Sequence, residues 1–248
     1  MITHTPCIKY SKKSPFISGE FSMTMTKIKI CGIKTLSDAQ AAIEAGADYL
    51  GFNFFPKSAR FIEIKKFIEI GAVLKKTHPS IKLVGVFVNS SSDEINSLLE
   101  TGILDLIQLH GDESPEFCVG FQNKAFKAFR GVPGAEADVY VRSEAPAFLV
   151  DAAVNGSYGG TGRVADWSSA ARLAKRYPLF LAGGLKPENV AEAVRQVNPW
   201  GVDVASGVES SPGKKDLSKM NAFVQAVHSI RSNEVGSQIT PGSSSEKL

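Results

Sequence analysis

Hydrophobic and polar positions alternate between two patterns along the chain. Short runs rich in Val, Ile, Leu and Phe, typical of buried strands, are each followed by a stretch with apolar residues at helical spacing. The eight strand candidates are 27–31, 47–54, 81–88, 104–111, 124–130, 145–152, 178–185 and 200–208. The helix candidates that follow them are 37–46, 63–76, 91–102, 114–121, a weak segment at 136–143, 166–177, 187–197 and 216–230. Strands separated by helices predict parallel pairing with crossover helices.

Eight such units in one chain predict a closed (β/α)8 TIM barrel, an α/β fold of about 250 residues in one domain. The chain has 248 residues, of which 43% are hydrophobic, so it can bury a core of that size. A doubly wound open sheet is the alternative. Against it, no GxGxxG follows the first strand candidate, and eight units are many for that fold. The sequence therefore predicts a single barrel domain at 27–231.

The two ends of the chain fall outside this repeating pattern. Residues 1–26 are polar, contain three lysines and no arginine, and lack the apolar core of a secretory signal. A transit peptide and an extension from an upstream start codon are both open, since Met23 and Met25 lie just before the first strand candidate. The tail, 232–248, has no aromatic residue and is rich in Ser. We expect both ends to be disordered.

Charge and cysteine content narrow the class of partner. The chain carries 28 basic and 25 acidic residues, a net charge of +3, which is too even to argue for nucleic acid. No apolar run approaches the ~20 residues of a membrane span. Cys7, Cys31 and Cys118 are odd in number and show no CxxC spacing, so neither a zinc site nor a disulfide framework follows. These features favour a reducing compartment, and hence the cytoplasm.

Glycine-bearing loops follow the last three strand candidates. They hold GGTG at 159–162, then Gly183 and Gly184, then Ser206 and Gly207. Glycine lets backbone N–H groups approach a ligand closely, and barrels of this type often bind phosphate after their seventh and eighth strands. One such loop is more often a tight turn, but three neighbouring loops favour a phosphate site.

A thiol and a carboxyl group end two other strand candidates, Cys31 the first and Asp151 the sixth. In a closed barrel these strands lie across the mouth from each other, so one group could take a proton while the other gives one. Taken alone, Cys31 is more often a small buried hydrophobic residue, and Asp151 a loop or capping residue. Together, over a phosphate site, they favour acid–base chemistry.

Four further residues carry weaker signals. Arg60, on the long loop after the second strand candidate, has the planar fork that suits a carboxylate, although a loop arginine is usually a solvated charge. His110 is a polar contact or a strand-end hydrogen-bonding residue, and we favour the structural role. Asp203 points either into the barrel or into a supporting network. Cys118 lies on a helix candidate and is expected in the core.

With these residues assembled, the sequence resembles the phosphoribosylanthranilate isomerase family. The matching stretches run in order from about residue 27 to 230 and are KICGI, GADYLGFNFFPKSARFI, VGVFVN, LIQLHGDE, LVDA, GGTG followed by DW, LAGGLKPENV and GVDVASGVESSPGKKD. A single motif such as AGG is weak. The ordered set, above all KICG, FFPKSAR, QLHGDE and SGVESSPGKKD, is specific.

The resemblance implies an isomerase of tryptophan biosynthesis that carries out an Amadori rearrangement. N-(5-phosphoribosyl)anthranilate would become 1-(2-carboxyphenylamino)-1-deoxyribulose 5-phosphate. The family's pattern makes Cys31 the general base, Asp151 the general acid and Arg60 the contact of the anthranilate carboxylate. No metal and no redox cofactor is implied, because the change is an internal proton transfer.

The same resemblance implies that phosphate is held, largely through backbone, by the loops around Gly183, Gly184, Ser206 and Gly207. His110 and Asp203 are candidates for support of the site. A small-molecule substrate is therefore the expected partner.

Some points are left open by the resemblance. The family usually has Thr after CGI, where this chain has Lys34, which either adds positive potential at the mouth or turns outward. Another phosphate-binding barrel, such as indole-glycerol-phosphate synthase, is a rival, but by resemblance its chemistry relies on lysine and glutamate at the mouth. A non-catalytic phosphosugar-binding protein is the second rival, and intact Cys31, Asp151 and Arg60 argue against it. A closed barrel has no free sheet edge, so we expect a monomer, with a dimer through helix faces left open.

Overall fold

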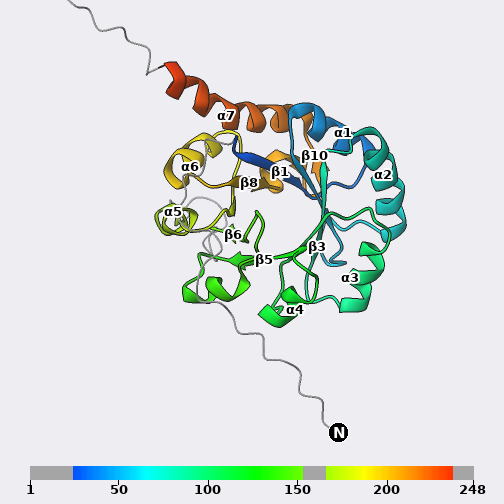
Figure 1. Ribbon diagram of the computed structural model, residues 1–248. Coiled ribbons are helices and arrows are strands. Elements are labelled where there is room, and N and C mark those ends of the chain that lie inside the picture. Colours follow the sequence, from blue (N-terminus) through cyan, green and yellow to red (C-terminus); the bar gives the residue numbers. More distant parts are fainter. Residues whose placement is uncertain (1–24, 153–165, 237–248) are drawn as a thin grey trace, which may run out of the picture.

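Eight parallel strands close into a barrel, in chain order, in the computed structural model of this protein (Figure 1). The strands are β1 (Lys27–Cys31), β2 (Tyr49–Asn53), β3 (Lys82–Phe87), β4 (Leu106–Leu109), β5 (Ala125–Arg130), β6 (Leu149–Asp151), β7 (Phe180–Ala182) and β8 (Gly201–Val204). The structure describes residues 25–152 and 166–236, with side chains to residue 230. The predicted barrel is confirmed and the open sheet is excluded, because β8 pairs with β1.

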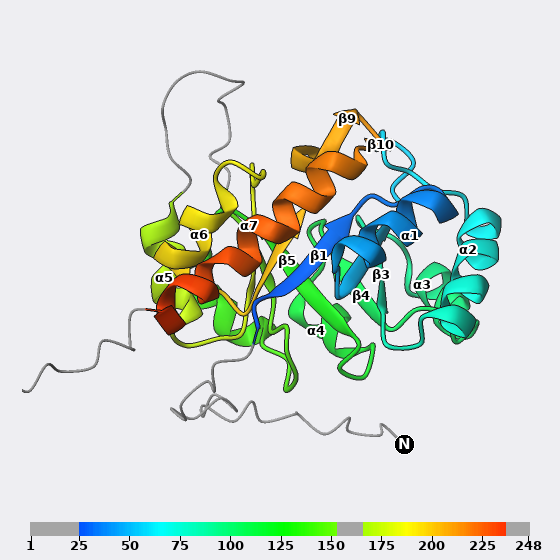
Figure 2. The ribbon, with the colours of Figure 1, turned by 90° about the horizontal axis from the view of Figure 1, so that it is seen from above.

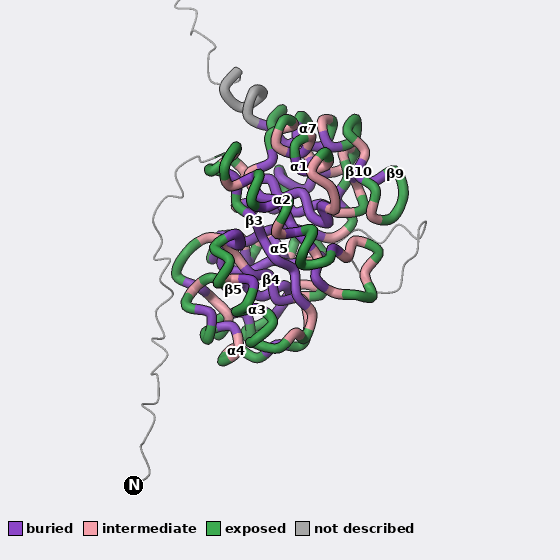
Figure 3. The backbone as a smooth tube through the Cα atoms, turned by 90° about the vertical axis from the view of Figure 1, so that its right-hand side faces the viewer, coloured by how far each residue is buried: buried purple, intermediate pink, exposed green. Residues whose placement is uncertain are grey.

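Helices form the outer layer around these strands. They are α1 (Leu36–Ala45), α2 (Ile64–Thr77), α3 (Ser92–Leu99), α4 (Pro115–Val119), α5 (Trp167–Ala174), α6 (Val190–Val197) and α7 (Leu217–Gly236). The weak fifth segment is a short 3-10 helix, η1 (Ala135–Tyr140). In Figure 3 the buried positions run through the middle of the molecule, and exposed positions gather on its outer faces.

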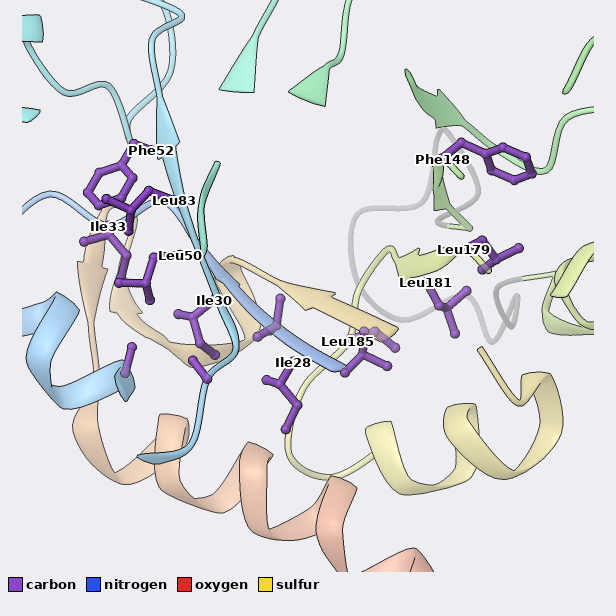
Figure 4. Packing of buried hydrophobic residues seen from close by; sticks show 14 of the residues in the cluster. Ile28, Ile30, Ile33, Leu50, Phe52, Leu83, Phe148, Leu179, Leu181 and Leu185 are labelled. Carbon is purple, nitrogen blue, oxygen red and sulfur yellow. The ribbon is translucent and has the colours of Figure 1, made fainter. Parts of the chain in front are cut away.

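The barrel strands are buried on both faces, because helices cover the outside and side chains fill the inside. On β1, Ile28 and Ile30 belong to the main apolar core, which Figure 4 shows in the layer beside the helices. Lys29 and Cys31 alternate with them and therefore face the barrel interior. The period of two in this strand thus delivers an ammonium group and a thiol to the inside of the barrel.

Aromatic rings fill the amino end of the barrel. The ring centroids of Tyr49 and Phe180 are 5.4 Å apart, and those of Phe180 and Trp200 are 5.0 Å apart. Phe126 and Leu149 belong to the same interior cluster. A Cβ on Gly201 would meet the Phe180 ring, so a residue without a side chain is needed where the two pack. Apolar side chains therefore fill the interior at this end.

A hairpin that the sequence analysis did not predict lies beyond the carboxyl end of β1 (Figure 2). It consists of β9 (Glu209–Ser211) and β10 (Lys214–Lys215) and follows a second 3-10 helix, η2 (Ser206–Val208). Gly213 in its turn has φ +79° and packs against the carbonyl oxygen of Ala59, which also accepts a hydrogen bond of 3.2 Å from Lys34 Nζ. Lys34 therefore ties together the loops after β1 and β2.

Both predicted tails and one predicted loop involve residues outside the described ranges. Residues 1–24, 237–248 and the GGTG loop at 159–162 lie there. α7 runs to Gly236, past the barrel boundary of 231 that the sequence suggested. No helix in the described part of the chain is long and apolar enough to cross a membrane.

Candidate active site

The residues singled out at strand ends gather at one end of the barrel. Cys31 is the last residue of β1, Asp151 is the last residue of β6, and His110 directly follows β4. Asp203 lies inside β8, next to the β1 residue Lys29 in the pairing of the two strands. Because all eight strands are parallel, their carboxyl ends open on the same side, where barrel enzymes hold their reactive groups.

Cys31 lies beside a buried ion pair. Lys29 Nζ donates to Asp203 Oδ1 at 2.8 Å, and the two side chains are 0% and 9% exposed. A Cβ on Gly51 would lie 2.7 Å from Cys31 Sγ and 3.0 Å from Lys29 Nζ, so the missing side chain of Gly51 leaves the space in which thiol and ammonium meet. Asp203 thus points into the barrel and holds Lys29 through this ion pair.

The environment of Cys31 opposes ionisation of its thiol. Burial raises the pKa of Cys31 above its ordinary value, and Lys29 offsets this only in part. Burial also acts to lower the pKa of Lys29, but the Asp203 carboxylate and Cys31 together raise it, so Lys29 is charged at neutral pH. Cys31 is therefore mostly a thiol at neutral pH, with a minor thiolate fraction that the ammonium group stabilises.

Asp151 and His110 form a second group at the mouth. Asp151 is partly buried and is three strands round the barrel from Cys31. Burial lowers the pKa of His110, and the nearby Asp151 carboxylate acts against that shift. Gln108 Nε2 lies 3.2 Å from His110 Nδ1, which in a neutral ring places the proton on Nε2 when the amide donates. His110 is an uncharged polar neighbour of Asp151.

Arg60 is held by an internal carboxylate. Its Nε and Nη2 atoms donate to Glu209 Oε1 and Oε2 at 2.8 and 2.7 Å, and Lys215 Nζ donates to Glu209 Oε1 at 2.9 Å. The side chains of Arg60, Glu209 and Lys215 are 26%, 3% and 0% exposed. Gly32 has φ +83°, and a Cβ there would lie 2.6 Å from Arg60 Cδ, so the arginine stem covers the residue after Cys31. The structure thus brings Arg60 next to Gly32, within electrostatic reach of Cys31.

The two described glycine loops touch each other. Gly183 and Gly184 follow β7 with φ values of +101° and +64°, in the left-handed region that favours glycine. Gly207, in η2 after β8, packs so closely on the carbonyl group of Leu185 that no Cβ would fit. Asn189 fixes the loop after β7 by donating to Gly184 O at 3.0 Å. Gly183, Gly184 and the Ser206–Gly207 segment therefore lie together, whereas the loop at 159–162 is outside the described residues.

Three ionisable residues at the mouth were missed by the sequence analysis: Lys29, Glu209 and Lys215. For Lys29 a signal existed, because a lysine between two β-branched residues of a barrel strand must face the interior. Glu209 and Lys215 lie in the SGVESSPGKKD motif, but their pairing depends on the unpredicted hairpin. Within the described ranges, no group of three or more His, Cys, Asp or Glu side chains is placed to hold a metal ion.

Comparison with known sequences identifies a family. The family model for N-(5'phosphoribosyl)anthranilate (PRA) isomerase matches residues 28–226. The N-(5'-phosphoribosyl)anthranilate isomerase of Citrifermentans bemidjiense is 46% identical over 207 residues, which cover 83% of this chain and 98% of that protein. The Pseudomonas putida protein of the same name is 45% identical over 208 residues, with 83% and 98% covered.

Solved structures lead to the same family. The phosphoribosylanthranilate isomerase of Thermotoga maritima is 36% identical with a TM-score of 0.73, covering 83% of this chain and 100% of that chain. An isomerase in complex with reduced 1-(o-carboxyphenylamino)-1-deoxyribulose 5-phosphate is 34% identical with a TM-score of 0.67, with 83% and 100% covered. The predicted resemblance is confirmed, and this protein belongs to the N-(5'-phosphoribosyl)anthranilate isomerase family.

Proposed function

We propose that this protein converts N-(5-phosphoribosyl)anthranilate to 1-(2-carboxyphenylamino)-1-deoxyribulose 5-phosphate in tryptophan biosynthesis, with Cys31 as general base and Asp151 as general acid. The observation that carries the assignment is the placement of a thiol and a carboxyl group on two separate strands of one barrel mouth. Groups of these types, spaced by a substrate, can give and take protons on opposite sides of it.

Ring opening and enolamine formation need one proton given and one taken, and the final tautomerisation needs one more of each. Asp151 protonates the ribose ring oxygen, the ring C–O bond breaks, and the ring opens to a protonated Schiff base. The Cys31 thiolate then removes the proton at C2 to give an enolamine. This intermediate gains a proton at C1 and loses the one on its C2 hydroxyl to become the ketone, so substrate and product are isomers.

Binding is assigned to the groups that surround the acid and the base. The adjoining loops at Gly183, Gly184, Ser206 and Gly207 supply backbone groups for the phosphate. Arg60, beside Cys31, supplies a cationic fork for the anthranilate carboxylate. The thiolate that acts as base is the minor form, since burial raises the pKa of Cys31.

A direct assay tests this assignment. Phosphoribosylanthranilate is generated in situ from anthranilate and phosphoribosyl pyrophosphate with the preceding enzyme, and the loss of its fluorescence is followed. We expect turnover by the natural protein, and a fall in kcat of about 10²- to 10⁴-fold in Cys31→Ala and in Asp151→Asn. Both variants should keep the circular dichroism spectrum of the natural protein.

Cys118→Ala is the matched control, because Cys118 is a buried free thiol on α4 rather than at a strand end. It should retain natural turnover. Near-natural turnover in Cys31→Ala or Asp151→Asn would remove that residue from the acid–base pair. A folded natural protein without turnover would contradict the reaction itself.

For the oligomeric state, the proposal is a monomer. A closed barrel leaves none of its eight strands with a free edge for pairing. The relatives vary, since one solved structure is of monomers derived from the dimeric enzyme of Thermotoga maritima. Sedimentation equilibrium that returned twice the chain mass of 26.6 kDa would overturn this proposal.

Location in the cytoplasm also stays a proposal. Its support is that Cys31 and Cys118, the two cysteines in the described residues, are both free. Fractionation of cells that make the protein at natural levels would test it, and recovery in another compartment would contradict it.

A further inference from the structure

Arg60 has two tasks that share one guanidinium group. The proposed function needs its guanidinium group for the carboxylate of the substrate, but Glu209 already binds Nε and Nη2. A guanidinium group has five N–H donors in one plane. Glu209 occupies one edge of that plane and leaves the edge formed by Nη1 and the second hydrogen of Nη2. This second edge can bind another carboxylate with two parallel hydrogen bonds.

Charge permits this double use. Glu209 carries one negative charge and faces two cations, Arg60 and Lys215, so the cluster of these three side chains is positive by one charge. Although burial acts in the other direction, hydrogen bonds from Arg60 and Lys215 hold the pKa of Glu209 below its usual value. An anionic substrate group therefore meets a cluster that is cationic overall.

Two contacts fix the arginine side chain. Its stem lies over Gly32, where the absence of a Cβ makes room for it, and its head is bound by Glu209. Glu209 is itself fixed, because it is 3% exposed and Lys215 binds it from the other side. Lys215 in turn donates to the carbonyl oxygen of Ala205 at 3.0 Å. The orientation of Arg60 is thus set by the hairpin β9–β10 rather than by its own loop alone.

We propose that Glu209 is a positioning residue, which holds Arg60 so that its outer edge faces the carboxylate of the substrate. Glu209 acts through Arg60 and does not touch the reacting atoms. The inference rests on the proposed function, because it needs a carboxylate-bearing substrate.

The test compares two ligands in natural protein and Glu209→Gln. One is reduced 1-(o-carboxyphenylamino)-1-deoxyribulose 5-phosphate, and the other is the same compound without the ring carboxyl group. The dissociation constant of the compound without the carboxyl group, divided by that of the compound with it, measures recognition of the carboxylate alone. We expect Glu209→Gln to reduce this ratio about 10-fold or more, since the neutral amide no longer holds a charged hydrogen-bonded pair. KM should rise by a similar factor, with kcat within about 2-fold.

Three further variants separate positioning from a merely structural effect. In an Arg60→Ala background, Glu209→Gln should reduce the ratio no further, because the residue through which it acts is gone. Glu209→Asp, which restores the charge on a shorter stem, should recover part of the ratio. Asp48→Asn makes the same chemical change in a carboxylate that pairs with Lys27 at 2.7 Å at the start of β1, and it should leave the ratio unchanged.

Each outcome decides the inference. A folded Glu209→Gln variant with the natural ratio would overturn the inference. The proposed function would still stand in that case, provided that Cys31→Ala loses turnover. If Glu209→Gln fails to fold, Glu209→Asp carries the test: a ratio between those of the natural protein and Arg60→Ala supports positioning, and the natural ratio overturns it. A natural protein without turnover overturns the proposed function, and the inference with it.

Discussion

The two ends of the barrel interior are built from different kinds of side chain. At the amino end, Tyr49, Phe126 and Phe180 pack with Leu149 in an apolar cluster. Toward the carboxyl end, the interior positions of β1 and β8 are an ammonium group, a thiol and a carboxylate. Apolar burial stabilises the fold, whereas burying charges costs free energy unless they are paired. The barrel therefore gains stability from apolar burial at one end and holds ionisable groups in its interior at the other.

Two lysines of β1 form ion pairs that differ in how far they are buried. Lys27 pairs with Asp48 at 2.7 Å with side chains that are 38% and 31% exposed, so water screens the pair. Lys29, two residues on, pairs with Asp203 at 2.8 Å with side chains that are 0% and 9% exposed. Similar distances thus join pairs of different energetic weight, and only the buried pair lies against Cys31.

Phe180→Ala tests whether the amino end serves stability alone. We expect the free energy of unfolding to fall by about 3–5 kcal/mol, because the variant leaves a cavity among Tyr49, Phe126 and Trp200. Turnover and KM should stay near natural values below the melting temperature. Urea unfolding measures the first quantity and the fluorescence assay the second. A loss of turnover comparable to that of Cys31→Ala, in a variant that remains folded, would break the division between the two ends.

Lys29→Met and Lys27→Met form the next test. The first leaves Asp203 buried without its cation and should lower the free energy of unfolding by about 3 kcal/mol. The second removes a partly exposed pair and should cost about 0–1 kcal/mol. Urea unfolding of both variants under one condition supplies the comparison. Equal costs would show that burial of the Lys29 pair has no special energetic weight.

The fold could be predicted because its signal is repeated eight times along the chain. Strand and helix patterns alternate, and each unit is a local feature with its own apolar period. The hairpin β9–β10 could not be predicted in this way. It is short, its pairing of Lys215 with Glu209 includes an irregular register, and it is held by contacts with the loop at Ala59. No apolar period marks it.

The site divides along the same line. Cys31 and Asp151 could be predicted as candidates because strand ends in a barrel have a fixed meaning, and their roles stay predictions that the assays test. Arg60 could be predicted as a candidate from the sequence, but its binding partner within the protein could not. Its bidentate contact with Glu209 joins residues 149 positions apart in sequence, and only folding brings them together. The partner of a charged side chain is a three-dimensional fact that a local pattern does not contain.

The smallest expected effect is a shift in the pH dependence of kcat/KM. It tests the end of the barrel that holds Cys31. If the Cys31 thiolate is the base, kcat/KM should rise as pH rises through the pKa of the thiol, which burial raises above its ordinary value. Lys29 lowers that pKa and Asp203 raises it. Lys29→Met should therefore move the ascending limb to higher pH. Asp203→Asn should move it to lower pH, because the ammonium group then faces the thiolate without a competing carboxylate.

The opposite directions are what make this measurement informative. Both variants disrupt the same ion pair. A general loss of packing would therefore move the ascending limbs of the two variants in the same direction, or would move neither. Profiles of kcat/KM at saturating auxiliary enzyme, with Lys27→Met as the control that keeps the natural limb, separate these cases. Shifts in the same direction in Lys29→Met and Asp203→Asn would mean that the ascending limb does not report the Cys31 thiolate. The pair would then serve only to stabilise the barrel, as the aromatic cluster does at the other end.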